Sequence, residues 1–397
     1  MGTLIASSSI SVYQNNITPD KTKAWLRKSL PERILVGYTT NKCEDLNDMG
    51  KVTTAVKDGV NVLIWCFLAF DNKPSSSNGH EAISKIKSGL NVDNFIKYKK
   101  QLIDLGYNDV VHLTAFGGWN GFHLPSGYSA EQLFHEFQSF NSQQDHLEDP
   151  LFDGIDWDLE GHDNVQSPNN EFTKECLDQM GEFSKLAKVN GLIVSLAPPE
   201  SYLDITSRKF SRFVNLTYPE PWHQDFEYHG ANVYSYILAK WNDYIDFVFL
   251  QFYESYSHAA YQISALGISP SKFLVSYMEQ LYLQNEGLVV HFQEDPSMDL
   301  ENQFVSLKLE KLVLGFANGW ALNDDIHKDK VIFFKKKDLE EANNDLTRKK
   351  IEPRGFGFWV IEEEGKHDVN YAKSLADILF KKHEVKECDD EPTFASE

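Results

Sequence analysis

The chain has 397 residues, of which 42% are hydrophobic and 13% aromatic, and its formal net charge is −21. This length and hydrophobic content are sufficient for one large folded core. The negative charge would repel nucleic acid, and no apolar run is long enough to span a membrane, so we expect neither partner. The four cysteines are scattered without the spacing of a metal site, and we expect no metal and no cofactor.

The N-terminus reads MGTLIASSSISVYQNN, with neither the basic start nor the long apolar run of a secretory signal. The compartment therefore stays open: the protein is extracellular if it is secreted by another route or its precursor was trimmed, and otherwise cytoplasmic. We interpret residues 1–32 as an N-terminal extension, residues 33–385 as a single domain that carries the active site, and residues 386–397 as a polar tail. We expect a monomer.

Apolar, β-branched segments recur along the chain and predict eight strands, at residues 34–39, 60–70, 110–116, 152–160, 192–197, 244–253, 311–316 and 355–361. Such near-continuous hydrophobic runs are typical of parallel strands that are covered on both faces. Several segments between them predict helices, at residues 94–105, 130–140, 171–189 and 337–349. The alternation predicts an α/β fold, the (β/α)8 TIM barrel. Residues 201–242 and 271–310 are too long for plain connections, and we interpret both as excursions that build walls on the substrate side.

Asp156, Asp158 and Glu160 alternate with apolar residues in the fourth predicted strand. Successive side chains of a strand point to opposite faces, so the three carboxyls should line one face, about 6.6 Å apart from neighbour to neighbour. Acids crowded on a buried face resist full ionisation, and at least one pKa should rise. A carboxylic acid that stays protonated near neutral pH can donate a proton to a leaving group. The row predicts acid catalysis, whereas Asp153, which has the opposite parity, is expected to be structural.

Two other interpretations of this segment are a calcium-binding loop and a solvent-facing strand. Asp156-x-Asp158-x-Glu160-Gly161 begins like an EF-hand calcium loop, but the twelfth place is Ser167 and offers no acidic ligand. The other interpretation is an acidic strand that faces solvent, and the apolar and glycine neighbours argue against it.

Polar and aromatic residues gather where the predicted strands end. In a TIM barrel the carboxyl ends of the strands form the active-site face, so we expect these residues to lie together. They are Tyr38, Phe70, Gly117-Gly118-Trp119, Glu160, Pro198-Pro199-Glu200, Gln251, Tyr253 and Trp359.

Asp153-x-x-Asp156-x-Asp158-x-Glu160 resembles the signature of glycoside hydrolase family 18, the chitinase family. The similarity extends over most of the chain, from about residue 33 to about residue 379. It includes Phe116-Gly117-Gly118-Trp119, Leu196-Ala197-Pro198-Pro199-Glu200, Gln251-Phe252-Tyr253-Glu254 and Trp359. The pattern at the sixth strand is similar to the plant and fungal type of the family rather than to the type with an inserted α/β subdomain.

The resemblance implies a chitinase-like hydrolase that cleaves β-1,4-linked N-acetylglucosamine with retention, with the acetamido group of the substrate as nucleophile. It implies that Glu160 is the general acid, that Asp158 holds the acetamido N–H and that Asp156 shares a proton with Asp158. Tyr253 would hydrogen-bond the acetamido carbonyl and Trp359 would stack beneath the sugar. The other implied substrate-binding residues are Gln251, Tyr38, Phe70, Gly118, Trp119 and Ala197. The implied partner is chitin or an N-acetylglucosamine oligosaccharide.

Two alternatives remain open from the sequence. An endo-β-N-acetylglucosaminidase that cuts the chitobiose core of N-glycans would use the same acids, and the two predicted excursions would decide between the substrates. A chitin-binding lectin on the same barrel would bind without cleavage. Glu160 and Tyr253 are both retained here, whereas non-hydrolytic relatives often lose the glutamate.

Overall fold

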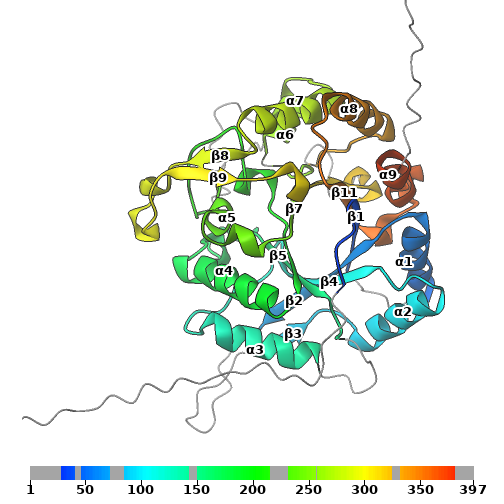
Figure 1. The fold of residues 1–397 in the computed structure, drawn as a ribbon, viewed down its shortest axis with the longest axis horizontal. Helices are drawn as coiled ribbons and strands as arrows, with labels where there is room; N and C mark the ends of the chain where they lie inside the picture. Colours follow the sequence, from blue (N-terminus) through cyan, green and yellow to red (C-terminus); the bar gives the residue numbers. More distant parts are fainter. Residues whose placement is uncertain are drawn as a thin grey trace, which may run out of the picture.

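A closed barrel of parallel strands forms the centre of the protein (Figure 1). We describe it from a computed structural model, in residues 28–40, 46–71, 85–142, 150–214, 231–255, 257–323 and 331–380. The strands are β1 (Ile34–Thr39), β2 (Val62–Phe70), β4 (Val111–Gly118), β5 (Gly154–Leu159), β6 (Ile193–Leu196), β7 (Phe247–Gln251), β10 (Leu312–Ala317) and β11 (Gly355–Trp359). Neighbours in this order pair in parallel, and β1 pairs with both β2 and β11, which closes the ring. The predicted barrel is therefore confirmed.

Helices surround the barrel (Figure 1). They are α1 (Leu46–Asp58), α2 (Val92–Asp104), α3 (Ala130–Asn141), α4 (Lys174–Val189), α5 (Ser235–Trp241), the single turn α6 (His258–Ala260), α7 (Pro270–Leu283), α8 (Lys336–Lys349) and α9 (Tyr371–Leu379). The four predicted helices correspond to α2, α3, α4 and α8. Local capping sets their starts: α4 begins at Lys174 because the Thr173 hydroxyl accepts a hydrogen bond from the backbone N–H of Cys176. In the part of the chain described here, no helix combines the length and the apolar character needed to cross a membrane.

The interpretation of residues 271–310 as a wall on the substrate side is partly wrong. Its apolar run, KFLVSYM, lies in α7, which belongs to the outer ring and packs against α8. The rest of the segment forms an antiparallel hairpin of β8 (Gly287–Val290) and β9 (Gln303–Ser306), which packs against α5 (Figure 1). Within the other predicted excursion, residues 215–230 lie outside the described residues, as do most of the N-terminal extension and the whole polar tail.

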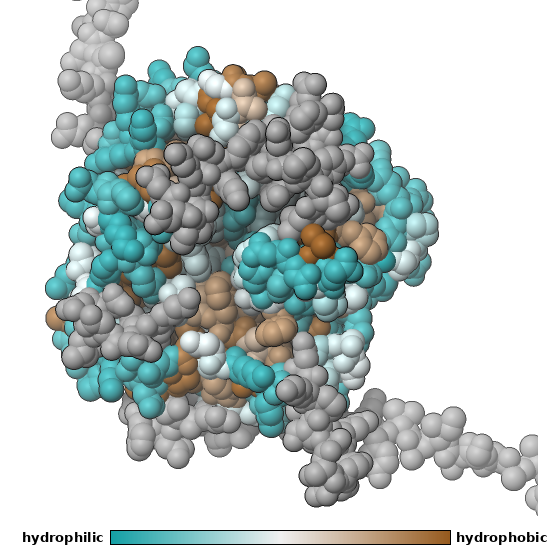
Figure 2. Space-filling view, turned by 180° about the vertical axis from the view of Figure 1, so that it is seen from behind, coloured by the Kyte–Doolittle hydropathy of each residue, from teal (hydrophilic) through white to brown (hydrophobic). Residues whose placement is uncertain are grey.

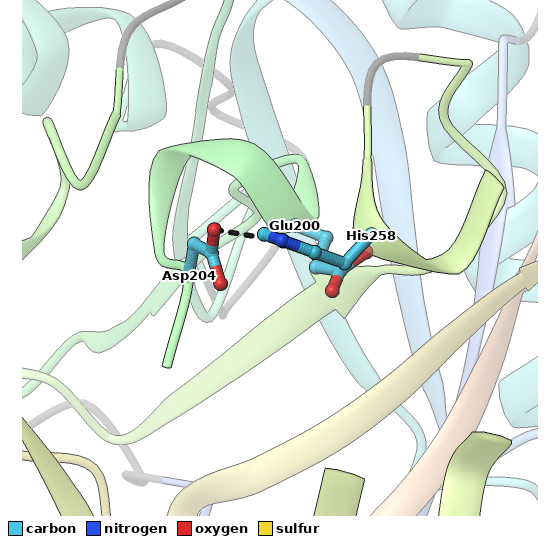
Figure 3. A group of neighbouring side chains, drawn as sticks. All are labelled: Glu200, Asp204 and His258. Carbon is cyan, nitrogen blue, oxygen red and sulfur yellow. Dashed lines mark ion pairs between the residues drawn. The ribbon is translucent and has the colours of Figure 1, made fainter. Parts of the chain in front are cut away.

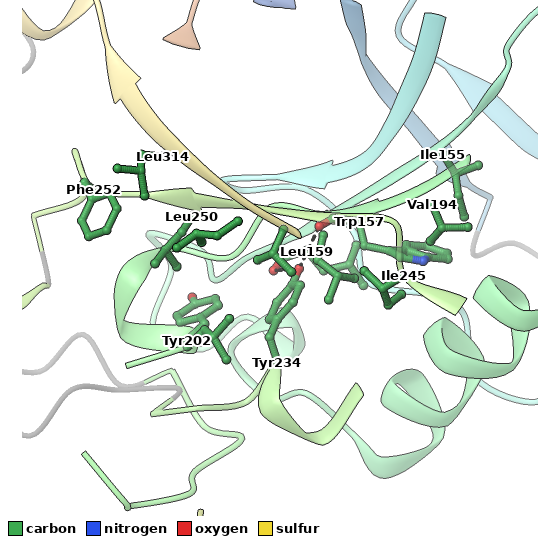
Figure 4. Close-up of a cluster of buried hydrophobic side chains, with 14 of the residues drawn as sticks. Ile155, Trp157, Leu159, Val194, Tyr202, Tyr234, Ile245, Leu250, Phe252 and Leu314 are labelled. Atoms are coloured by element: carbon green, nitrogen blue, oxygen red, sulfur yellow. Dashed lines mark hydrogen bonds between the residues drawn. The ribbon is translucent and has the colours of Figure 1, made fainter. Parts of the chain in front are cut away.

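Two apolar cores follow from the alternation of side chains along the strands. The inner core fills the barrel and includes Val36, Ile64 and Leu113, and the outer core lies between the strands and the helices. Ile155, Trp157 and Leu159 of β5 belong to the outer core (Figure 4). On the face of the molecule opposite to the view of Figure 1, polar side chains cover most of the periphery and apolar side chains gather near the middle (Figure 2).

A short additional strand pairs with the end of β2, outside the ring of eight strands. β3 (Ile86–Ser88) pairs antiparallel with the last residues of β2, with Ile86 opposite Phe70. In the same region the pairing of β2 with β4 shifts register between Cys66 and Leu68. This irregularity changes which side chains of β2 face the barrel, because two adjacent residues then share one face.

Candidate active site

The acid row lies on the inner face of β5. Asp156, Asp158 and Glu160 are 0%, 4% and 6% exposed, whereas the residues between them face the outer core. The alternation predicted from the sequence is therefore confirmed. Glu160 follows the last residue of the strand, so its carboxyl lies at the carboxyl end of the barrel, where TIM barrels carry their active sites.

Asp156 is the deepest member of the row and accepts two hydrogen bonds. The Tyr38 hydroxyl donates to its Oδ2 over 3.0 Å, and the Ser195 hydroxyl donates to its Oδ1 over 2.5 Å. Burial raises the pKa of Asp156 to about 6, and the two hydroxyl donors oppose this rise by stabilising the carboxylate. Asp156 is thus held in one orientation and loses its proton near neutral pH.

Asp158 is oriented by an amide from a neighbouring strand. Nε2 of Gln251, on β7, donates to Asp158 Oδ1 over 2.9 Å and to the carbonyl oxygen of Ala197 over 2.6 Å. Burial raises the pKa of Asp158 well above its usual value, and the neighbouring charges of Glu160 and Asp156 raise it further. Ala197 contributes its backbone carbonyl here.

Burial favours the protonated form of Glu160. Burial raises its pKa well above the ordinary value, and the charge of Glu254 adds to the rise, while hydrogen bonds with Asp158 and Gln251 oppose it. A carboxyl group that keeps its proton at neutral pH can act as a general acid. The sequence predicted such a rise within the row but did not include Glu254, whose own pKa burial raises to about 7.

Tyr253 also faces the inner core, two residues beyond Gln251. Burial raises the pKa of its hydroxyl well above 10, and the nearby charges of Glu254, Asp158 and Glu160 add to the rise. The hydroxyl therefore stays protonated and can donate a hydrogen bond. Its ring meets Trp320 edge to face, with 6.2 Å between ring centroids.

Aromatic rings gather around Trp359 at the end of β11. The rings of Phe67 and Trp359 are nearly parallel, at 24° and 6.1 Å between centroids, and Trp320 stands almost perpendicular to Trp359 at 6.5 Å. Tyr38 lies 5.9 Å from the same indole. Phe67, Trp320 and Trp359 are only partly buried, so they leave aromatic surface beside the acid row. Such surface suits the apolar face of a sugar.

Gly118 makes room for this aromatic group. A Cβ atom at this position would lie 2.6 Å from a ring carbon of Phe67, and the backbone has φ +79°, which L side chains rarely adopt. The glycine is therefore required both by its conformation and by the close approach of the ring.

Phe70, an expected substrate-binding residue, lies elsewhere. It is 3% exposed and stacks on Phe116 in the outer core, with 5.4 Å between ring centroids. The register shift in β2 is the physical reason, because it brings Cys66 and Phe67 to the inner core together and turns Phe70 outward. Phe70 is therefore no longer a candidate substrate-binding residue, and Phe67 is the candidate in its place.

Trp119 lies near the carboxyl end of β5, whereas Asp153 lies just before the start of β5. Trp119 is 39% exposed, and its indole N–H donates to Asp163 Oδ1 over 2.9 Å, close to the end of β5. Asp153 lies before β5 and accepts a hydrogen bond of 2.8 Å from the backbone N–H of His112. Trp119 can thus meet a ligand at the rim, whereas Asp153 joins two neighbouring strands.

Two tyrosines support the end of β5 from the outer side (Figure 4). The strand pairing of β5 with β6 reaches only to Trp157. Beyond it, the Tyr234 hydroxyl donates to the carbonyl oxygens of Leu159 (2.9 Å) and Trp157 (3.3 Å). The backbone N–H of Gly161 donates to the Tyr202 hydroxyl over 3.1 Å. These side chains replace the missing ladder and hold the backbone that carries Asp158 and Glu160.

Sequence reasoning missed four residues of this site: Phe67, Ser195, Glu254 and Trp320. Ser195 had a visible signal, because it is a polar residue inside an otherwise apolar strand. Glu254 had one too, because it directly follows Tyr253. Trp320 lies in an irregular turn after β10, and no periodic pattern marks it.

Comparison with known proteins identifies the fold. No protein-family model matches the sequence, and no curated protein matches it. Among solved structures, a fungal endo-β-N-acetylglucosaminidase of glycosyl hydrolase family 18 matches with a TM-score of 0.50 and 14% identity, over 88% of this chain and 99% of that chain. The family 18 chitinase ChiB from Flavobacterium johnsoniae matches with a TM-score of 0.48 and 13% identity, over 88% and 94%. The catalytic domain of a Pyrococcus furiosus chitinase matches with a TM-score of 0.48 and 13% identity, over 89% and 96%. This chain therefore shares the barrel fold of the fungal family 18 structure.

Proposed function

We propose that this protein is a chitinase-like glycoside hydrolase of the family 18 type, which cleaves β-1,4-linked N-acetylglucosamine. The observation that carries the proposal is the buried row of Asp156, Asp158 and Glu160, with Glu160 at the carboxyl end of the barrel, where burial raises the pKa of its carboxyl. The shared fold agrees with this function.

The first step of the proposed reaction breaks the glycosidic bond. Glu160 gives its proton to the glycosidic oxygen while the carbonyl oxygen of the sugar's own acetamido group bonds to the anomeric carbon. This forms an oxazolinium intermediate and releases the other part of the chain as an alcohol, and the two displacements together retain the configuration at the anomeric carbon. Asp158 accepts a hydrogen bond from the acetamido N–H and stabilises the developing positive charge. In the second step water opens the intermediate, and Glu160 takes up a proton from that water.

The remaining residues hold the sugar in place. The protonated Tyr253 hydroxyl donates to the acetamido carbonyl and aligns it for attack, and Trp359 supports the apolar face of the ring. Gln251 keeps Asp158 oriented through its 2.9 Å hydrogen bond, and Tyr38 does the same for Asp156. The wall of the site would also include Gly118, Trp119 and Ala197.

The proposed subtype is the plant and fungal one. Between β7 and β11 the described residues contain ring helices, single turns and the β8–β9 hairpin, and they contain no inserted α/β subdomain. This supports the similarity noted at Gln251 and Tyr253.

The deciding experiment measures turnover and products on two substrates, a fluorogenic chitotrioside and a glycoprotein with N-glycans. We expect release of the fluorophore by the wild type. Glu160→Gln should lower turnover at least about 10²-fold, the lower end for loss of a general acid, while oligosaccharide binding persists. Glu131→Gln, at an exposed carboxyl on α3, is the control and should retain full activity.

Each alternative gives a different result. Near-normal turnover by Glu160→Gln would remove this residue from its role. Binding of the chitotrioside by the wild type without any release of product would identify a lectin. Cleavage of the glycoprotein but not of the chitotrioside would keep the proposed chemistry and change the substrate to the N-glycan core.

A further inference from the structure

Three potential metal ligands meet outside the acid row. Glu200 begins a turn after β6, Asp204 follows four residues later, and His258 is the first residue of α6 after β7. One carboxylate oxygen from each acid and one ring nitrogen of His258 lie within 4.8 Å of one another. Figure 3 shows the three side chains together, with the ion pair between Asp204 and His258 marked.

The hydrogen bonds of this cluster are incomplete. Glu200 is fully buried, and its Oε2 accepts a hydrogen bond of 2.9 Å from the backbone N–H of Ala259. Its Oε1 is also buried and has no hydrogen-bond partner among the described residues. An unpartnered carboxylate oxygen in this position is costly. This oxygen is therefore available to bind a ligand at the cluster.

A second buried oxygen nearby lacks a partner. The Tyr277 hydroxyl, on α7, is buried and makes no hydrogen bond within the described part of the chain. Burial raises the pKa of this hydroxyl, and the charges of Glu200 and Asp204 add to the rise. The hydroxyl is therefore close enough to both carboxyls to interact with them electrostatically. Two orphaned oxygens therefore belong to the same small region.

We propose that Glu200, Asp204 and His258 bind one divalent transition-metal ion, with Zn²⁺ as the best match. Two carboxylates and one imidazole are a typical mixed ligand set for zinc, whereas Ca²⁺ and Mg²⁺ prefer oxygen ligands only. The two negative charges would balance the charge of the ion. Glu200 Oε1 would gain the partner that it lacks.

The spacing of the ligand atoms suits this ion. Atoms bound tetrahedrally at about 2.1 Å from zinc lie roughly 3.4 Å apart. His258 Nδ1 and Asp204 Oδ2 are 2.9 Å apart, and no pair in the cluster exceeds 4.8 Å. Asp204 Oδ2 is the oxygen that faces the imidazole, whereas Asp204 Oδ1 accepts hydrogen bonds from the backbone N–H and the hydroxyl of Thr206.

The cluster is also accessible. The side chain of His258 is 24% exposed, and its ring lies beside the hydroxyl of Thr206, at 3.1 Å from Nδ1. Thr206 lines a cavity of about 360 Å³ that opens between residues 205–208 and the β8–β9 hairpin. The exposed part of the His258 ring gives an ion access to the cluster.

The proposed site would join two active-site loops without taking part in the chemistry. One loop follows β6 and carries Glu200 and Asp204, and the other follows β7 and runs from Tyr253 through Glu254 to His258. The Ser257 hydroxyl, next to His258, donates to the carbonyl oxygen of Glu254 over 2.7 Å. A bound ion would therefore fix the segment on which Tyr253 and Glu254 lie, and its loss would loosen that segment.

The test titrates ZnCl₂ into the full-length protein after treatment with a chelator, by isothermal calorimetry. We expect one ion per chain and a higher melting temperature with zinc than with chelator. Glu200→Gln keeps an acceptor for the Ala259 N–H and removes the charge, and His258→Gln removes the nitrogen ligand. Each should weaken zinc binding at least about tenfold and abolish the shift in melting temperature.

His291→Ala is the matched control, because His291 forms a surface pair with Glu294 at 3.6 Å and belongs to no cluster of three potential ligands among the described residues. It should bind zinc as the wild type does. Absence of zinc binding by the wild type, or unchanged binding by both cluster variants, would overturn the proposal. If the variants do not fold, zinc K-edge absorption of the wild type decides: nitrogen and oxygen neighbours at about 2.0–2.2 Å are expected, and a sulfur neighbour at about 2.3 Å contradicts the site.

Discussion

Replacement of Asp156 by asparagine should remove a loss of stability that the wild type suffers as pH rises towards neutral. Asp156 has a pKa of about 6 in the folded protein against an ordinary value of 3.8. The folded state therefore holds this proton over a pH range in which the unfolded chain has lost it. As pH rises through this range the folded state loses stability, and above pH 6 it carries the whole cost of a buried charge. An asparagine cannot ionise, so the variant escapes this cost.

The size of the effect follows from the displacement of the pKa. Each unit corresponds to about 1.4 kcal/mol, so a rise from 3.8 to about 6 costs roughly 3 kcal/mol at a pH above both values. The Tyr38 and Ser195 hydroxyls already reduce this cost. At pH 4 the unfolded carboxyl is already partly ionised, so Asp156→Asn should gain about 2.4 kcal/mol in unfolding free energy, relative to the wild type, between about pH 4 and about pH 8.

Urea unfolding at both pH values measures this difference. The comparison across pH removes any constant effect of the substitution, such as an altered hydrogen bond to Tyr38. Asp104→Asn, at an exposed carboxyl paired with Lys100, is the control and should change the unfolding free energy by less than about 0.5 kcal/mol at either pH. A difference between Asp156→Asn and wild type that does not vary with pH, or that varies in the opposite direction, refutes the reasoning.

Three further predictions concern the same site. Tyr253→Phe should lower kcat about tenfold or more, the effect of losing roughly 1.4 kcal/mol of transition-state hydrogen bonding, with little change in KM; steady-state kinetics in which only KM rises would contradict the role. Glu254→Gln removes a charge that raises the pKa of Glu160, so the basic limb of the pH–rate profile should move to lower pH. A limb that does not move would show that Glu254 does not influence the ionisation of Glu160. Gly118→Ala should destabilise the fold by about 1–3 kcal/mol more than Gly127→Ala, because both have φ near +80° but only Gly118 has a ring carbon 2.6 Å from the added Cβ; thermal melts that coincide would show that crowding is absent.

The acid row and the barrel could be predicted from the sequence because both depend on short-range periodicity. The alternation of Asp156, Asp158 and Glu160 with apolar residues fixes their common face once the segment is a strand. The eight apolar runs likewise fix the order of the strands. In a parallel barrel, chain order then determines which strand ends meet, and this was sufficient to bring Tyr38, Gln251 and Trp359 to one end.

The rest of the site depends on features that no periodic pattern reveals. The register shift in β2 exchanges the faces of its last residues, so Phe67 lies at the site and Phe70 does not. Trp320 reaches the same region from an irregular turn. The run KFLVSYM could belong to a buried strand or a buried helix, and the Ser269 cap followed by Pro270 was the local signal for the helix.

The hydroxyl contacts of Tyr202 and Tyr234 bear on any attempt to graft this catalytic strand into another scaffold. A designer who copied only the inward-facing acids would transfer a backbone whose final carbonyls and amide have lost their donors and acceptor. The positions of the grafted carboxyls would then vary by more than about 0.5 Å, the positional tolerance of a catalytic group. Both tyrosines are buried, and a graft has to include them together with the strand.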